Sequence, residues 1–257
     1  DGDLDLVISD AGSIASAGGI LVYENDGNGV FTDVTATAFT GTNIPVFVVK
    51  FCDYDLDGDQ DFVAGGGIDS FSFPHPTRLY SNNGAGVFTY VQDMVSTLDS
   101  ANNFAWGDID GDGYSELLLS EGGTLTQSGG TQSMALYRNI AGVLSLDTTF
   151  EAAAFNNTLE QTTSVEFGDV DRDGDLDLFV SRTDNTDGAL NMMLINDGSG
   201  SFSNEALTRL PQMNSSFGDK SSDSQFVDVN NDGYLDIIVA NSHMTIAPDQ
   251  SGDMLLN

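Results

Sequence analysis

The 257-residue sequence has few of the residues that build disulfides, transition-metal sites or nucleic-acid surfaces. Its single cysteine, Cys52, excludes an internal disulfide and any zinc site made of several cysteines. Two histidines, His75 and His243, leave little for a histidine-based metal site. Only seven lysines and arginines accompany 40 aspartates and glutamates, so we expect no nucleic-acid partner. No apolar run approaches the ~18 residues that span a bilayer, so we expect no membrane insertion.

The residues that are present are those of a folded protein. The hydrophobic fraction is 40%, with 16 Phe, 7 Tyr and 1 Trp, which argues against disorder in spite of a formal net charge of −33. The length suits one large domain or two small ones. A compact chain with this charge repels itself unless something neutralises the acids. The positions of the acids are therefore the most informative feature of the sequence.

The acidic residues recur in a nine-residue loop pattern, Asp-x-Asp-x-Asp-Gly-x-x-Asp. Its glycine returns at Gly58, Gly113, Gly174 and Gly233, and the tail of another copy surrounds Gly2, so the period is 55 to 61 residues. The candidate metal ligands in the four full copies are Asp53, Asp55, Asp57, Asp59 and Asp61; Asp108, Asp110, Asp112, Tyr114 and Glu116; Asp169, Asp171, Asp173, Asp175 and Asp177; and Asp228, Asn230, Asp232, Tyr234 and Asp236. The truncated copy keeps only Asp1, Asp3 and Asp5.

This spacing is typical of a calcium loop. Side chains at positions 1, 3 and 5 can converge on one point, the glycine at position 6 permits a sharp turn, position 7 offers its carbonyl oxygen, and position 9 closes the site. Hard carboxylate and carbonyl oxygens in that number suit calcium, whereas magnesium prefers octahedral geometry and retained waters. We predict up to four calcium sites, the strongest at Asp169, Asp171, Asp173 and Asp177, and expect the truncated copy to stay empty.

Two other structures share parts of this loop pattern. An EF-hand shares its first half but needs Glu at position 12 and flanking helices. Position 12 holds apolar residues in all four copies: Ala64, Leu119, Val180 and Val239. An Asx-turn without metal explains any single copy, but four copies with one ligand spacing favour metal binding.

The rest of the period repeats as well. An aromatic residue and then a compact one precede each full loop, at Phe51-Cys52, Trp106-Gly107, Phe167-Gly168 and Phe226-Val227. An apolar run follows each loop, as in 117–119, 178–180 and 237–239, and predicts a buried strand. Further on, Asn-Asp-Gly or Asn-Asn-Gly between apolar runs predicts a hairpin. Each period thus holds four strand candidates, which favours an all-β propeller of four-stranded antiparallel blades over a solenoid.

Together these motifs resemble the FG-GAP or VCBS-type repeat of integrin α-subunits and of large bacterial surface proteins. Phe167-Gly168 supplies the Phe-Gly element, and the absence of Gly-Ala-Pro makes the chain look closer to the bacterial VCBS branch. The resemblance covers essentially the whole chain and implies calcium in the blade loops and a ring of seven blades. We therefore expect one propeller domain over residues 1–257, a fragment of about 4.5 blades, with repeat units 1–50, 51–105, 106–166, 167–225 and a partial 226–257.

Three functions are compatible with such a domain. The first is a secreted or cell-surface adhesion module that binds a protein or glycan through loops of variable length, at 9–19, 65–77, 120–132, 182–189 and 241–252. The second is the propeller part of a calcium-dependent secreted enzyme, of polysaccharide lyase or phospholipase type, whose catalysis lies mostly outside this chain. The third is a structural spacer. The few basic residues are scattered and no Gly-x-Ser-x-Gly motif occurs, so we expect no catalytic residues here.

Overall fold

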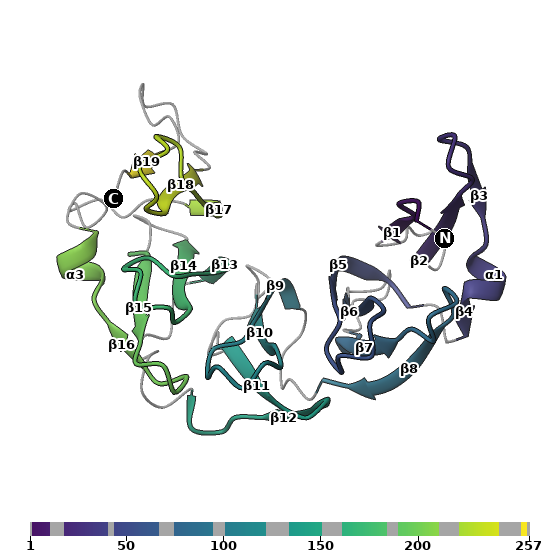
Figure 1. Cartoon of the computed structure of the whole chain (residues 1–257), viewed down its shortest axis with the longest axis horizontal. Coiled ribbons are helices and arrows are strands. Elements are labelled where there is room, and N and C mark those ends of the chain that lie inside the picture. Colours follow the sequence, from purple (N-terminus) through teal and green to yellow (C-terminus); the bar gives the residue numbers. More distant parts are fainter. Residues whose placement is uncertain are drawn as a thin grey trace. The chain divides into compact units, whose positions relative to one another are not determined.

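The computed structural model describes residues 2–10, 18–40, 44–66, 75–94, 101–121, 134–150, 161–183, 190–210, 221–241 and 253–255. The chain separates into two compact units, Asp1–Asn102 and Asn103–Asn257, and each is described by itself. The described residues form an all-β structure of five sheets, numbered here in chain order, which can be followed in Figure 1. No helix in these ranges is long and apolar enough to cross a membrane.

The first unit contains two sheets. The first sheet has the order β1 (Leu6–Asp10), β2 (Gly19–Asn25) and β3 (Phe31–Asp33), and is followed by the one-turn helix α1 (Thr35–Ala38). The second sheet runs β5 (Val46–Cys52), β6 (Asp61–Gly66), β7 (Arg78–Ser81) and β8 (Phe88–Asp93), all antiparallel. The two-residue strand β4 (Phe39–Thr40) pairs in parallel with β8 and so joins the end of the first sheet's segment to the second sheet.

The second unit contains the remaining sheets. The third sheet consists of β9 (Ala101–Gly107), β10 (Glu116–Glu121), β11 (Met134–Ile140) and β12 (Val143–Leu146). The fourth consists of β13 (Gln161–Gly168), β14 (Asp177–Thr183), β15 (Met192–Asn196) and β16 (Phe202–Asn204), followed by the one-turn helix α3 (Ala206–Arg209). The fifth consists of β17 (Ser221–Val227), β18 (Asp236–Asn241) and β19 (Asp253–Leu255).

Each full acidic loop connects an aromatic-bearing strand to the next strand of the same sheet, as between β5 and β6 or between β13 and β14. The strand that carries the aromatic residue pairs with the strand after the loop, so that Cys52 lies opposite Asp61 and Gly168 opposite Asp177. The predicted strands are therefore present, but the predicted repeat boundaries at 51, 106, 167 and 226 fall inside β5, β9, β13 and β17. The sheets divide the chain a few residues earlier, before the aromatic strand.

The strand after each loop forms the centre of the core because it is covered on both faces. Phe62, Leu118 and Phe179 in these strands are fully buried. One buried cluster lies between the third and fourth sheets and another involves the fourth and fifth, while a third fills the contact between the first and second. Two-sided burial explains the unbroken apolar runs. The prediction that these apolar runs are buried is wrong for Ile238 in β18, whose exposed fraction is 42%.

The glycines before the second and third full loops, Gly107 and Gly168, have a packing role. A Cβ atom on Gly168 would lie 2.7 Å from the Phe226 ring and 3.0 Å from the Leu235 side chain of the next sheet. Gly107 has the same relation to Phe167 and Leu176, at 2.9 Å from each. The aromatic residue of one sheet therefore packs on the glycine of the preceding sheet, which leaves no room for a side chain there.

The structure contains two short helices that were not predicted, and two predictions about the whole chain stay untested. The helices α1 and α3 were not predicted, because four residues are too short to show a helical period. The single domain over residues 1–257 and the closed ring of blades remain predictions.

Candidate metal centre

Three of the acidic loops gather carboxylates into compact clusters. The first cluster is Asp53, Asp55 and Asp57; the second is Asp108, Asp110 and Glu116; the third is Asp169, Asp171 and Asp177. Within each cluster, one oxygen of every member lies within 4.8 Å of the others. Positions 1 and 3 of the loop thus converge as the spacing predicts. The third member is position 5 in the first cluster and position 9 in the other two.

The glycine at position 6 orients the acid at position 1. Its backbone N–H donates to Oδ2 of that acid in every full loop, at 3.1 Å for Gly58 and Asp53 and at 2.8 Å for Gly233 and Asp228. The corresponding distances in the second and third loops are 2.9 and 3.2 Å. These glycines have φ between +89° and +99°, a conformation that other residues rarely adopt, so the turn requires glycine at this position.

Position 4 of the loop also has a positive φ, which the sequence pattern did not reveal. The angle is +59° at Leu56, +66° at Arg172 and +61° at Asn231, whereas the second loop has Gly111 there with +74°. Only glycine and asparagine tolerate this region easily, so Leu56 and Arg172 store backbone strain.

The acid at position 9 ties the loop to the hairpin turn about 20 residues later. Asp177, which is 0% exposed, accepts backbone hydrogen bonds from Val170 at Oδ2 and from Asn196 at Oδ1, both at 3.0 Å. The same pair of bonds reaches Asp61 from Tyr54 and Asn82 and reaches Glu116 from Ile109 and Asn139. The acid at position 9 therefore accepts hydrogen bonds that hold the fold together. In the second and third loops it also belongs to the carboxylate cluster.

The hairpin asparagine completes this connection and was missed as a site residue. Its Nδ2 donates to the carbonyl oxygen at position 8 of the loop: Asn25 to Leu4, Asn82 to Gln60, Asn139 to Ser115 and Asn196 to Leu176. Its Oδ1 accepts backbone N–H groups within the turn, as Asn196 does from Gly198 and Gly200. The sequence does contain a signal for this connection, because the hairpin asparagine follows the position-9 acid at a nearly constant distance in each repeat. From the sequence, the asparagine was predicted only to form a turn.

The decisive feature of the clusters is a set of buried oxygens without a donor. Oδ1 of Asp53, Asp110 and Asp169 is buried and has no hydrogen-bond partner, and the same holds for Oδ1 of Asp59. A carboxylate oxygen withdrawn from water without a donor is costly. Three of these atoms belong to clusters whose other members are also carboxylates. A hard cation satisfies such oxygens, so the residues present fit a metal ion of the calcium class.

The electrostatics of the metal-free loops agree with this interpretation. Burial raises the pKa of Asp61 to about 6 and the pKa of Glu116 to about 7. Burial and neighbouring carboxylates also raise the pKa of Asp55 and of Asp177. A bound cation favours the charged form of each acid and therefore reverses these shifts.

Two clusters also have an arginine beside the acid at position 3. Arg209 Nη2 lies 3.0 Å from Asp171 Oδ2, and Arg138 Nη1 lies 3.8 Å from Asp110 Oδ2. In the described ranges no such ion pair reaches the first cluster. The second and third clusters are therefore partly neutralised by side chains of the chain itself.

The other predicted ligands lie outside these clusters. Oδ1 of Asp112, Asp173 and Asp232 accepts the backbone N–H two residues later, as in an Asx-turn. In the fourth loop, Asp232 N–H is shared by Asp228 and Asn230, and among the described residues this loop forms no group of three acids. Tyr234 lies under Arg172, 5.0 Å from its guanidinium carbon. Metal ligation remains a prediction for the fourth loop and for Asp59, Asp61, Asp112, Tyr114, Asp173 and Asp175.

A comparison with known protein families supports the repeat found in the sequence and in the sheets. A search of curated proteins gave no match. The FG-GAP-like repeat family matches three stretches, residues 1–64, 53–119 and 169–239, which together cover most of the chain and include every acidic loop. Membership of the VCBS branch remains a prediction. With four full acidic loops in equivalent places of successive sheets, the chain belongs to the FG-GAP-like repeat family.

Proposed function

We propose that this chain is a calcium-stabilised β-propeller scaffold that works outside the cell or at its surface and binds a protein or glycan. The observation that carries the proposal is the buried, donor-free oxygen in each carboxylate cluster, at Asp53, Asp110 and Asp169. These atoms are costly in the metal-free state and become favourable when a divalent cation lies beside them. Calcium is preferred because the clusters offer only hard oxygens, with neither His nor Cys among them.

The effect of the ion on the fold follows from where the acids lie. In each cluster the acids at positions 1 and 3 belong to the turn between the first two strands, and position 9 begins the second strand. A bound ion neutralises the acids and holds this turn, while the position-9 acid links it to the hairpin asparagine. Because the arrangement exists only in the folded chain, ion binding stabilises the fold by mass action.

The propeller arrangement is proposed from the packing of successive sheets. Phe167 and Phe226 each pack on the glycine of the preceding sheet, so the same contact is repeated from sheet to sheet within the second unit. A contact repeated by a constant rotation about one axis, without a rise along it, closes into a ring. We propose seven blades, as the family resemblance implies.

The ligand-binding surface is proposed from the variable loops. The segments 9–19, 65–77, 120–132, 182–189 and 241–252 differ in length while the scaffold repeats, as expected where recognition lies on loops. The larger part of each lies outside the described residues. An extracellular location follows from the proposed metal, because loops of this kind are useful where calcium is abundant. We propose no catalysis in this chain, since Arg78, Arg138 and Arg209 are each paired with an acid.

Calcium titration by calorimetry tests the proposal. The full chain in metal-free buffer should bind calcium, and the double variant Asp169→Asn/Asp171→Asn should lose one site. Glu24→Gln is the matched control, because it removes a negative charge from an exposed position in β2 outside the clusters. Absence of heat and of any gain in melting temperature at millimolar calcium would overturn the proposal. An equal loss in the control would overturn the assignment of the third cluster.

A further inference from the structure

A chain of three buried hydrogen bonds joins the second carboxylate cluster to the third, within the second unit. Glu116 of the second cluster accepts the Ile109 backbone N–H at 2.9 Å. The Ile109 carbonyl oxygen accepts from Asn196 Nδ2 at 2.8 Å, and the Asn196 backbone N–H donates to Asp177 of the third cluster at 3.0 Å. These four residues are at most 3% exposed, so water does not compete for the bonds.

Ile109 lies between two acids of the second cluster. Its N–H belongs to the peptide group that it shares with Asp108, and its carbonyl oxygen belongs to the peptide group that it shares with Asp110. Both peptide groups are planar, so the two hydrogen bonds fix the orientation of the backbone on each side of Ile109. The directions in which the side chains of Asp108 and Asp110 leave the backbone therefore depend on the bond from Asn196.

The side-chain amide of Asn196 is fixed because it has several partners at once. Besides Ile109, its Nδ2 donates to the carbonyl oxygen of Leu176, the residue before Asp177. Its Oδ1 accepts two backbone N–H groups of its own hairpin turn, at 3.2 and 3.0 Å. The hydrogen bonds therefore tie the position of the Ile109 carbonyl group to that of Asp177, as a network that carries coupling between two sites requires.

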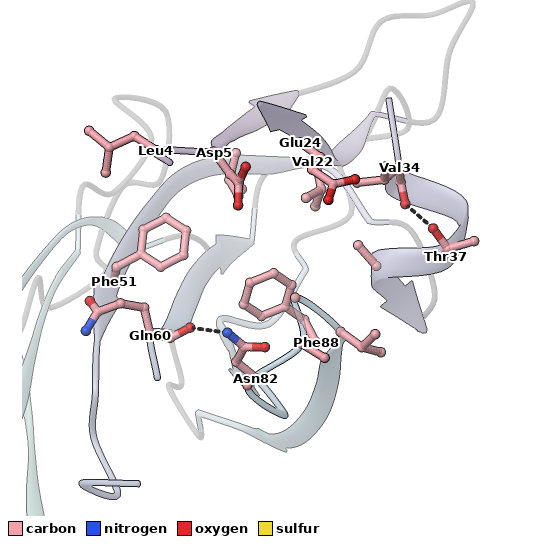
Figure 2. Close-up of a pocket in the computed structure, with 16 residues that line it drawn as sticks. Leu4, Asp5, Val22, Glu24, Val34, Thr37, Phe51, Gln60, Asn82 and Phe88 are labelled. Atoms are coloured by element: carbon pink, nitrogen blue, oxygen red, sulfur yellow. Dashed lines mark hydrogen bonds between the residues drawn. The ribbon is translucent and has the colours of Figure 1, made fainter. Parts of the chain in front are cut away.

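Hairpin asparagines bind the loop of their own sheet, and Asn196 binds the loop of a second sheet as well. Figure 2 shows a bond of the first kind in the first unit, as a dashed line between Asn82 and the carbonyl oxygen of Gln60, at 3.3 Å. The Asn82 backbone N–H likewise donates to Asp61. Asn196 makes both of these bonds within its own sheet and also the bond to Ile109. This additional bond brings two clusters into one network.

A second contact joins the same two parts of the chain, but it opposes the binding of metal. Arg138 Nη2 donates at 2.7 Å to the carbonyl oxygen of Gly200, in the hairpin turn that follows Asn196. Arg138 Nη1 lies 3.8 Å from Asp110 Oδ2 in the second cluster. An ion beside Asp110 repels this guanidinium group. The contact of Arg138 therefore does not favour two ions at once, whereas the chain through Asn196 has a cluster acid at each end.

We propose that Asn196 couples the second and third clusters, so that a calcium ion at one cluster strengthens binding at the other. The inference rests on the proposed function, because it requires both clusters to bind calcium. An ion at the third cluster fixes Asp177 and with it the Asn196 amide, so the peptide groups of Ile109 are already ordered when the second ion binds. The conformational entropy lost on ordering the loops is then shared by two ions, and the second ion binds more tightly.

Calcium titrations followed by NMR test the coupling one cluster at a time. The position-6 glycine donates its N–H to an acid of its own loop, so the amide resonances of Gly113 and Gly58 report the second and first clusters separately. The double variant Asp169→Asn/Asp171→Asn disables the third cluster. We expect the calcium dissociation constant reported by Gly113 to rise about fivefold or more, and that reported by Gly58 to rise less than about twofold.

This comparison leaves the charge beside the second cluster unchanged. Three carboxylates with one bound calcium ion carry a formal charge of −1, and so does the double variant, in which Asp177 is the one cluster acid left. A weaker affinity at the second cluster therefore does not arise from a loss of nearby negative charge. By linkage, Asp108→Asn/Asp110→Asn should weaken calcium binding at the third cluster by the same factor, as reported by Gly174.

Asn196→Ala tests whether the asparagine carries the coupling. In this background, disabling the third cluster should no longer change the calcium affinity of the second. A purely structural role of Asn196 would weaken both clusters but would leave the affinity of one dependent on the other. Arg138→Gln is the control, because it removes the other contact between the same two parts and should leave the coupling in place. The comparison made with Asn196 present does not depend on whether either of these variants folds.

The outcomes separate the coupling from the proposed function. Weaker binding at the second cluster of the double variant, without an equal change at the first, supports both the calcium sites and the coupling. An unchanged dissociation constant at the second cluster overturns the coupling and leaves the calcium sites in place, whereas no calcium binding at any cluster overturns both. An equal weakening at the first cluster, or a coupling that survives in Asn196→Ala, overturns the role of Asn196.

Discussion

The side chain of Asn196 donates a hydrogen bond to the carbonyl oxygen of Ile109, 87 residues earlier, at 2.8 Å. This bond joins the hairpin turn of the fourth sheet to the acidic loop of the third. The same Nδ2 also donates to Leu176 at 3.1 Å within its own sheet. One buried asparagine therefore holds two acidic loops in a fixed relation, and the contact between sheets is polar as well as apolar.

Replacement of Asn196 tests that role. Asn196→Ala should lower the free energy of unfolding by about 2–4 kcal/mol, because it removes several hydrogen bonds and leaves buried backbone groups without partners. Asn25→Ala is the matched control: Asn25 makes the same bonds inside the first sheet, but they are exposed, and among the described residues its side chain makes no such bond to a neighbouring sheet. Its expected loss is about 1 kcal/mol. Equal losses in denaturant unfolding would contradict the role of Asn196 between sheets.

The raised pKa of Glu116 predicts how calcium and pH act together. Burial raises this pKa from 4.5 to about 7, so the metal-free folded chain keeps a proton that the unfolded chain releases. The folded state binds more protons in this window, and its stability therefore falls as pH rises between about 4.5 and 7. Calcium needs the ionised acid, so the stabilisation it gives grows over the same window.

Melting temperatures in metal-free and calcium-containing buffer, measured across that window, check this prediction. Asp61, with its pKa raised by burial to about 6, contributes in the same direction. Glu116→Gln should flatten the metal-free pH dependence because it removes one titrating group. A calcium effect that does not change with pH would show that protons and calcium do not compete at these acids.

The strained position 4 predicts a stabilising substitution. Leu56 is 52% exposed and has a φ of +59°, and the same position is Asn231 in the fourth loop. Leu56→Asn should raise the free energy of unfolding by about 1 kcal/mol, since asparagine tolerates this conformation better than leucine. Leu207→Asn, at an exposed position in α3, should give no gain. If Leu56→Asn lowers the free energy of unfolding measured by chemical denaturation, backbone strain at Leu56 does not limit the stability of this loop.

From the position of Arg209 beside the third cluster, we predict that this arginine weakens calcium binding there. Arg209→Gln should tighten calcium binding at Asp169, Asp171 and Asp177 by about three- to tenfold, because it removes a positive charge 3.0 Å from Asp171. Arg78→Gln is the control, since Arg78 pairs with Asp93 in the second sheet, away from the loop clusters. Terbium luminescence measures the affinity. Unchanged binding in Arg209→Gln would show that this ion pair does not compete with the metal.

The sequence predicted those parts of the site that depend on local spacing. Asp53 and Asp55 converge because alternate positions of a tight turn point to one side, and the apolar run at Leu118 is buried because its strand has neighbours on both faces. The glycine at position 6 was predicted to permit a sharp turn, and it has a positive φ in all four full loops. These features are properties of nine consecutive residues or of one strand.

The features that were missed depend on contacts between distant segments. Asp177 was assigned as a ligand, but its bond to Asn196 depends on the register of β14 and β15, which the pattern did not determine. Arg209 reaches Asp171 across 38 residues, through a helix too short to predict. Asp57, Asp112 and Asp173 all stand at position 5 of their loops and accept the backbone N–H two residues later, but of these three only Asp57 belongs to a carboxylate cluster. The pattern of residue types does not distinguish these three positions.

Anomalous diffraction from crystals grown in calcium tests the central claim most directly, because it places the ion among named atoms. We predict a calcium peak within each cluster, in contact with Oδ1 of Asp53, of Asp110 and of Asp169, the buried oxygens that have no hydrogen-bond donor. Crystals that contain millimolar calcium but show no peak at any of these three oxygens would contradict the account.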